Sequence, residues 1–214
     1  RVLSELLPAE GRSGLQYWHL GKTIKDSQNM NTSRLASWLF DKVYEKTPTI
    51  VNELINKDRP TSAIVLARHR MFEVVLGGDQ SRPICAPQEF PPERLIHHTL
   101  LRETGIWKDE GGRWSLAEPT SEAAIDISEL WSVISATLQA QTPPSFAALL
   151  DLLAAPPWGV RAGPAGVWLV LYVLIHRNRC AVFERGTLIL ELTSEHLQRM
   201  YKNPQVFELR ELAQ

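Results

Sequence analysis

The chain has 214 residues, a formal net charge of −1, 44% hydrophobic residues and 22% charged residues. These values are typical of an ordinary soluble domain, and they exclude a disordered chain or a membrane protein. Because the positive and negative charges balance, any binding to nucleic acid or anionic lipid would need a local basic patch.

The first part of the sequence predicts a small hairpin followed by helices. Residues 15–20 and 23–25 flank Gly21 and are expected to pair as antiparallel strands. Apolar residues at helical spacing then predict three helices, over residues 32–47, 48–55 and 61–76. Gly77 and Gly78 are expected to end the third helix.

The middle of the sequence predicts one more helix and a second hairpin. The helix is expected over residues 93–104, with Gly105 just past its end. Residues 106–116 have a hairpin pattern in which Trp107 and Trp114 can stack across the strands. The acidic stretch after this hairpin predicts a connection between two domains, a helical domain with small hairpins (1–122) and a second domain (123–214).

The second domain has the element order of a winged-helix unit. Helices are expected over residues 126–141, 145–153 and 164–177, and short strands over 180–183 and 188–192. A helix over residues 194–202 and a strand near 206–209 are expected to finish the chain. The predicted fold class is therefore mainly α with small β hairpins (α+β), a helical bundle followed by a winged-helix-like unit.

The longest apolar run occupies residues 164–175, where a winged-helix protein would have its recognition helix. Its twelve residues are too few to cross a membrane, which takes about 20. The run exposes no Arg, Lys, Asn or Gln that could contact bases or phosphates. A helix that is apolar all round belongs in a core or under another domain, which argues against docking in a DNA groove.

Basic side chains instead surround the end of this helix and the predicted wing. The candidate nucleic-acid contacts are Arg177, Arg179, Arg185, Arg199 and Lys202. The alternative interpretation is a solvated face whose cations complement helix ends. Trp158, in a Pro-Pro-Trp-Gly turn, is a candidate partner contact, and packing over its own turn is the alternative.

Residues His19 to Thr23 end like a phosphate-binding loop, but the glycine required at position 16 is Gln, so the motif fails. Cys85 and Cys180 are isolated, and no CxxC, HExxH or GxSxG motif occurs. We expect Cys180 to be a small buried residue at the start of a strand. The sequence thus predicts no catalytic residue, no metal and no cofactor, and a fragment that is not itself an enzyme.

Two further groups of titratable residues are expected to be structural. Arg68, His69 and Arg70 occupy successive helical positions, which spread over about 200° and cannot form one patch. His97 lies beside an apolar helical stripe and is expected to be partly buried.

Several short stretches follow one another between residues 31 and 207. They are Val43-Tyr44 to Thr47-Pro48, Asn52 to Asn56, Ala67-Arg68, Pro92-Glu93-Arg94 with Leu100-Leu101 and Thr104-Gly105, Pro156 to Val160 with Gly163-Pro164, and Phe183 to Leu192 before Leu197 and Asn203-Pro204. In this order they resemble a region of the very large prokaryotic P-loop ATPases of phage-defence islands, of the BREX type and related systems. The resemblance implies a segment outside the ATPase motor.

The resemblance implies a noncatalytic antiviral-defence module whose partners are other domains or subunits of a defence complex. The chain begins with Arg rather than Met, which fits a piece of a longer, cytoplasmic protein with no membrane partner. Two hypotheses follow. The first is an interaction or regulatory module that serves assembly or coupling to DNA, and the second is a DNA-binding winged-helix domain that uses its basic wing.

Overall fold

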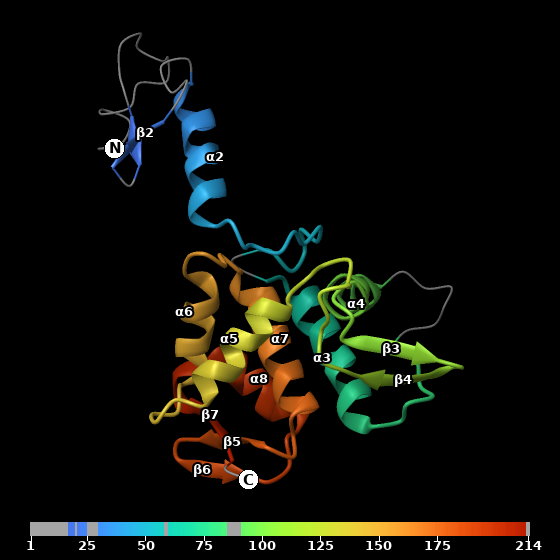
Figure 1. The fold of residues 1–214 in the computed structure, drawn as a ribbon. Helices are drawn as coiled ribbons and strands as arrows, with labels where there is room; N and C mark the ends of the chain where they lie inside the picture. The colour runs from blue at the N-terminus through green and yellow to red at the C-terminus, as the bar shows by residue number, and fades with distance from the viewer. Residues whose placement is uncertain (1–16, 20, 25–29, 58–59, 85–90, 213–214) are drawn as a thin grey trace. The chain divides into compact units, whose positions relative to one another are not determined.

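The computed structural model in Figure 1 describes residues 17–212, except positions 20, 25–29, 58–59 and 85–90. The chain divides into two compact units, Arg1–Lys46 and Thr47–Gln214. The domain boundary expected between residues 122 and 123 lies inside the second unit. The hydrophobic core of that unit takes residues from both sides of this position.

The first unit contains the hairpin and the first long helix that the sequence predicts. Its elements are β1 (Trp18–His19), β2 (Lys22–Thr23) and α2 (Thr32–Val43). The strands pair antiparallel, and Gly21 in the turn has a φ of +75°. Lys22 thus belongs to a strand rather than to a phosphate-binding loop. Helix α2 begins after Asn31, whose side chain accepts a hydrogen bond from the backbone N–H of Arg34 at 2.9 Å.

The helix expected over residues 48–55 is wrong, because this segment forms an irregular turn. Side-chain hydrogen bonds from two asparagines replace the helical ones. The Asn52 carboxamide accepts from the backbone N–H of Ile55 and donates to the hydroxyl of Thr99, 47 positions away. Asn56 donates to the carbonyl of Ile50.

The next helices agree with the sequence pattern, with one local change of winding. They are α3 (Ser62–Gly77), α4 (Pro92–His97) and the π-helical segment η2 (His98–Arg102). Helix α3 ends at Gly78, whose φ of +69° is the left-handed conformation expected of a C-terminal glycine. His97 is partly buried, as predicted, with its ring 4.6 Å from that of Trp107.

The second hairpin is confirmed. It consists of β3 (Trp107–Glu110) and β4 (Arg113–Leu116), which pair antiparallel. The rings of Trp107 and Trp114 stack with centroids 4.4 Å apart, as the sequence predicts. The indole N–H of Trp114 also donates to the carbonyl of Arg82, so the hairpin is attached to the loop after α3.

The C-terminal part gathers four helices and one small sheet. The elements are α5 (Ser128–Leu138), α6 (Phe146–Ala154), α7 (Ala162–Ile175), β5 (Cys180–Glu184), β6 (Thr187–Ile189), α8 (Ser194–Lys202), the 3-10 turn η3 (Pro204–Val206) and β7 (Phe207–Glu211). The antiparallel sheet has the order β6-β5-β7, so β6 is an edge strand. It lies at one end of the helices in Figure 1.

Helix α7 is the centre of the core. Every residue from Pro164 to Val173 is buried, and Trp168 donates its indole N–H to the carbonyl of Leu100 at 3.1 Å. The prediction of a buried helix is therefore confirmed. Together with the small antiparallel sheets, these helices confirm the α+β class.

Across the described residues, no helix combines the length and the hydropathy that a membrane span needs.

Candidate functional site

The five predicted nucleic-acid contacts lie on three elements at the C-terminal end of the chain. Arg177 and Arg179 lie in the turn after α7, Arg185 lies in the turn between β5 and β6, and Arg199 and Lys202 belong to α8. Arg185 has a φ of +51°, so this turn holds it in the left-handed conformation that is uncommon for residues other than glycine. The structure places carboxylates beside two of the five.

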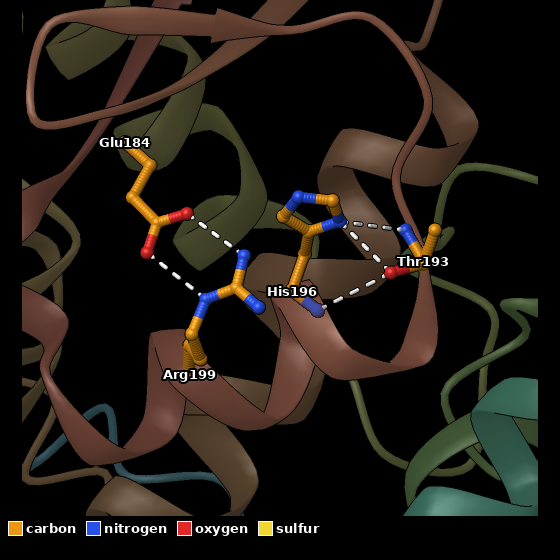
Figure 2. A network of polar contacts seen from close by, with 4 residues as sticks. All are labelled: Glu184, Thr193, His196 and Arg199. Carbon is orange, nitrogen blue, oxygen red and sulfur yellow. Dashed lines mark hydrogen bonds and ion pairs between the residues drawn. The ribbon is translucent and has the colours of Figure 1, made fainter.

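Arg199 is fully engaged by a glutamate of the β5–β6 hairpin. Its Nε donates to one carboxylate oxygen of Glu184 at 3.0 Å and its Nη2 to the other at 2.8 Å, as Figure 2 shows. This two-point pairing is the strong geometry of arginine with a carboxylate. The hydrogen bond from Arg199 lowers the pKa of Glu184, so this carboxylate stays ionised at neutral pH. Arg199 therefore fixes α8 to the hairpin with two of its five N–H donors, and an incoming phosphate would meet a guanidinium whose charge is already balanced by Glu184.

The start of α8 is held in the same region by a capping box, also drawn in Figure 2. The backbone N–H of Thr193 donates to Nδ1 of His196, and the backbone N–H of His196 donates to the hydroxyl of Thr193. This exchange fixes where α8 begins, and so where Arg199 meets Glu184.

Arg179 lies between two carboxylates. Its Nη2 is 3.8 Å from Glu118, and its Nε is 3.7 Å from Glu211 on β7. The neighbouring His176 is buried, with Nε2 3.3 Å from Glu118. Burial lowers the pKa of His176, and the positive charge of Arg179 acts in the same direction, so the imidazole is neutral at pH 7.

The remaining three cations make no side-chain ion pair with any described residue. Arg177, Arg185 and Lys202 are exposed, and they come from three different elements. Only Lys202 lines a pocket together with other basic side chains. The five predicted contacts thus do not form one uniform basic surface, since two of them are paired with carboxylates.

Trp158 packs inside the fold. It is 7% exposed and belongs to the hydrophobic core, which agrees with the alternative interpretation of packing over its turn. Its indole is therefore not a surface for a partner. Cys180 is buried at the start of β5, as expected, and burial raises the pKa of its thiol to about 12. Cys85 lies outside the described residues.

A cluster that the sequence did not reveal lines a pocket of about 480 Å³, which we call the cationic pocket. Its basic side chains come from four segments of the second unit: Lys57, Arg68, Arg161 and Lys202. Sequence analysis placed Arg68 in a run of basic residues that cannot share a patch, and the structure agrees. Arg68 is buried, whereas Arg70 is exposed and pairs with Glu93 at 3.0 Å.

No sequence motif links these four cations. They are far apart along the chain, from Lys57 near the start of the second unit to Lys202 near its end. The one local indication is a charged residue at position 68, on the same helical stripe as the buried Ile64 and Met71.

Comparison with known proteins gives no further assignment: no family model, no curated protein and no solved structure matches this chain.

Proposed function

We propose that this chain is a noncatalytic interaction module with a winged-helix-like C-terminal part, in which the β5–β6 hairpin is the wing. Its partners would be other domains or subunits of a phage-defence ATPase complex, as the resemblance of residues 31–207 implies. The module would serve assembly of that complex or its coupling to DNA.

The observation that carries the proposal is an exposed apolar edge on the wing. Leu190 is 92% exposed and Leu188 is 44% exposed, and both line one open hollow of about 530 Å³. They lie in and just after β6, whose outer edge pairs with no other described strand. Exposed apolar side chains at an unpaired sheet edge are typical of surfaces that bind another protein chain.

Two neighbouring features favour a protein over DNA as the partner of this surface. Helix α7 is buried and therefore cannot enter a groove in the usual way. Arg199 is already bonded to a carboxylate, and Arg179 lies 3.8 Å from another. A phosphate would have to compete with Glu184 for the guanidinium of Arg199.

The experiment mixes the purified chain with the separately produced P-loop ATPase motor of its defence system. Replacing Leu190 with Asp should weaken the complex by about tenfold or more, because an aspartate would have to be desolvated at the interface. Val51 is 81% exposed and lies far from β6 in the sequence, so Val51→Asp is the matched control and should leave affinity unchanged. Equal affinity of wild type and Leu190→Asp would contradict the proposed surface.

The alternative, a DNA-binding wing, is tested on the same protein. At about 150 mM salt we expect no tight binding of a short DNA duplex. A tight, salt-sensitive complex would favour the alternative if replacing Arg177, Arg179 and Arg185 with Ala weakened it and reduced its salt dependence.

A further inference from the structure

The cationic pocket lies away from the wing, among four segments of the second unit. The loop before α3 contributes Ile55 and Lys57, and α3 itself contributes Arg68. The start of α7 contributes its N-cap residue Arg161, and the last turn of α8 contributes Lys202. At about 480 Å³ its size is within the range of small-molecule sites.

The charged side chains that line this pocket among the described residues are all positive. Four of its lining side chains are cations, and no described residue that lines it is an aspartate or a glutamate. Positions 58 and 59 lie outside the described residues. Cations that converge in a concave site raise the local positive potential and attract anions. The same chain pairs Arg70, Arg179 and Arg199 with glutamates.

Arg68 is the unusual member of the set. It is 8% exposed, yet its guanidinium donates no hydrogen bond and forms no ion pair with any described residue. Its one contact of this kind is the ring of Tyr201, 3.4 Å from the guanidinium carbon. A cation–π contact compensates only part of the cost of burying a charge, which proteins otherwise meet with a hydrogen-bonded anion. Arg68 therefore lines the pocket with N–H donors that no described residue accepts.

Tyr201 supports Arg68 through its ring rather than its hydroxyl. The hydroxyl is buried against Gly166 of α7 and has no hydrogen-bond partner among the described residues. Burial raises the pKa of this phenol far above neutral, so it stays protonated and uncharged beside the guanidinium. The ring fits because α7 has glycine at position 166: a Cβ there would come within 2.4 Å of the Tyr201 ring.

The N-terminal end of α7 also favours an anion in the pocket. Ala162 and Gly163 line the pocket, and they belong to the first turn of a 14-residue helix whose N–H groups lack helical partners. Arg161 is held at this end by a 2.7 Å hydrogen bond from its Nη1 to the carbonyl of Asn56. A Cβ at position 163 would approach the carbonyl of Ile55 to 2.2 Å, so glycine allows the loop to pack against the helix.

We propose that the cationic pocket binds the phosphate group of a small organic phosphate, with Arg68 as the central contact. Arginine matches phosphate with two parallel hydrogen bonds, and the lysines at the rim add charge. Pro60 and Val65 offer apolar surface for the body of the ligand. This proposal is independent of the interface on the wing.

The test measures binding to the full chain by calorimetry with three defined probes: AMP, inorganic phosphate and adenosine. AMP should bind more tightly than phosphate, because it also fills the apolar part, and adenosine should bind at least about tenfold more weakly than AMP. Absence of AMP binding at about 1 mM, or equal binding of adenosine, would overturn the proposal.

The central variant is Arg68→Met, which keeps an unbranched side chain over Tyr201 without the charge. It should weaken AMP binding about tenfold or more. Arg70→Met is the matched control, because Arg70 lies on the same helix, outside the pocket, and should change affinity less than about twofold. Equal affinities of Arg68→Met and wild type would refute the role of Arg68.

If Arg68→Met does not fold, which its circular dichroism spectrum would show, the exposed rim decides the question. The double variant Lys57→Met/Lys202→Met replaces two exposed side chains and should still weaken AMP binding several-fold. Unchanged binding would then overturn the proposal. A short DNA duplex that displaces AMP would assign the phosphate to a polynucleotide and would also overturn the small-molecule proposal.

Discussion

Two arginines, one on α8 and one packed against it, have opposite surroundings. Arg199, on the helix, is held by both carboxylate oxygens of Glu184, whereas Arg68 lies over the Tyr201 ring of the same helix and has no carboxylate within the described residues. The half-buried Arg199 has a carboxylate partner, whereas the buried Arg68 has none among the described residues. Because solvation lowers the cost of an exposed charge but not of a buried one, the unpaired Arg68 indicates the place where an external anion fits best.

The comparison also changes the meaning of the basic residues near the wing. A cation that the protein has already paired contributes little to binding of an outside phosphate, because the phosphate must displace the carboxylate. A count of arginines in the sequence therefore overestimates the positive charge that is available at the wing. It also fails to reveal the cationic pocket.

The largest expected effect comes from a core substitution in α7, the helix that leads from the pocket to the turn before β5. Trp168→Ala should lower the free energy of unfolding by about 3–5 kcal/mol, because Trp168 is fully buried in α7 and its hydrogen bond to Leu100 would be lost. Urea unfolding followed by circular dichroism measures this change. Leu190→Ala is the control, with an expected change within about 0.5 kcal/mol. A small effect of Trp168→Ala would mean that the two regions do not depend on one core.

A smaller effect is expected from a substitution beside the cationic pocket and away from the wing. Gly166→Ala places a methyl group against the Tyr201 ring and should cost about 1–3 kcal/mol of stability while weakening AMP binding. Gly77→Ala, with no neighbour within 4 Å of the added carbon, is the control and should preserve both properties. Stability comes from urea unfolding and affinity from calorimetry. Unaltered AMP affinity in Gly166→Ala would argue that the position of Tyr201 does not matter for the pocket.

The smallest effect is expected from breaking the Arg199–Glu184 ion pair at the wing. Arg199 lowers the pKa of Glu184 in the folded chain below its usual 4.5, so the unfolded chain takes up the proton first as the solution is acidified. The stability from this pair is therefore present above about pH 4.5 and is lost as the pH falls through the lower folded value. Glu184→Gln should lower the melting temperature slightly at pH 7 and lose less stability than wild type on acidification. Parallel pH profiles of the two proteins would contradict this.

Elements with strong local patterns could be predicted from the sequence. Asn31 caps α2, Gly78 ends α3, and the helix expected over residues 194–202 is α8 itself. Trp107 and Trp114 stack as their places in a hairpin predict. In each case the atoms that decide the structure lie within a few residues of one another, so periodicity and capping suffice.

The failures have long-range causes. The segment 48–55 has a helical apolar pattern, yet Asn52 bonds to Thr99 and forms a turn instead. The strand expected near residues 206–209 is β7, but its pairing with β5, more than twenty residues away along the chain, is something that no local pattern shows. Contacts between distant segments override local propensity at these places.

The sequence by itself determined most of the helices and the hairpins, although not the turn over 48–55, and it determined that the helix over 164–175 would be buried, because an all-apolar surface must leave water. Only the tertiary structure decided the state of each charged side chain. Packing brought Glu184 to Arg199 and placed Arg68 beside Tyr201. No sequence pattern links the two members of either pair. Charge interactions depend on distance and burial in space rather than on spacing along the chain, so the sequence contains the arginines but not their partners.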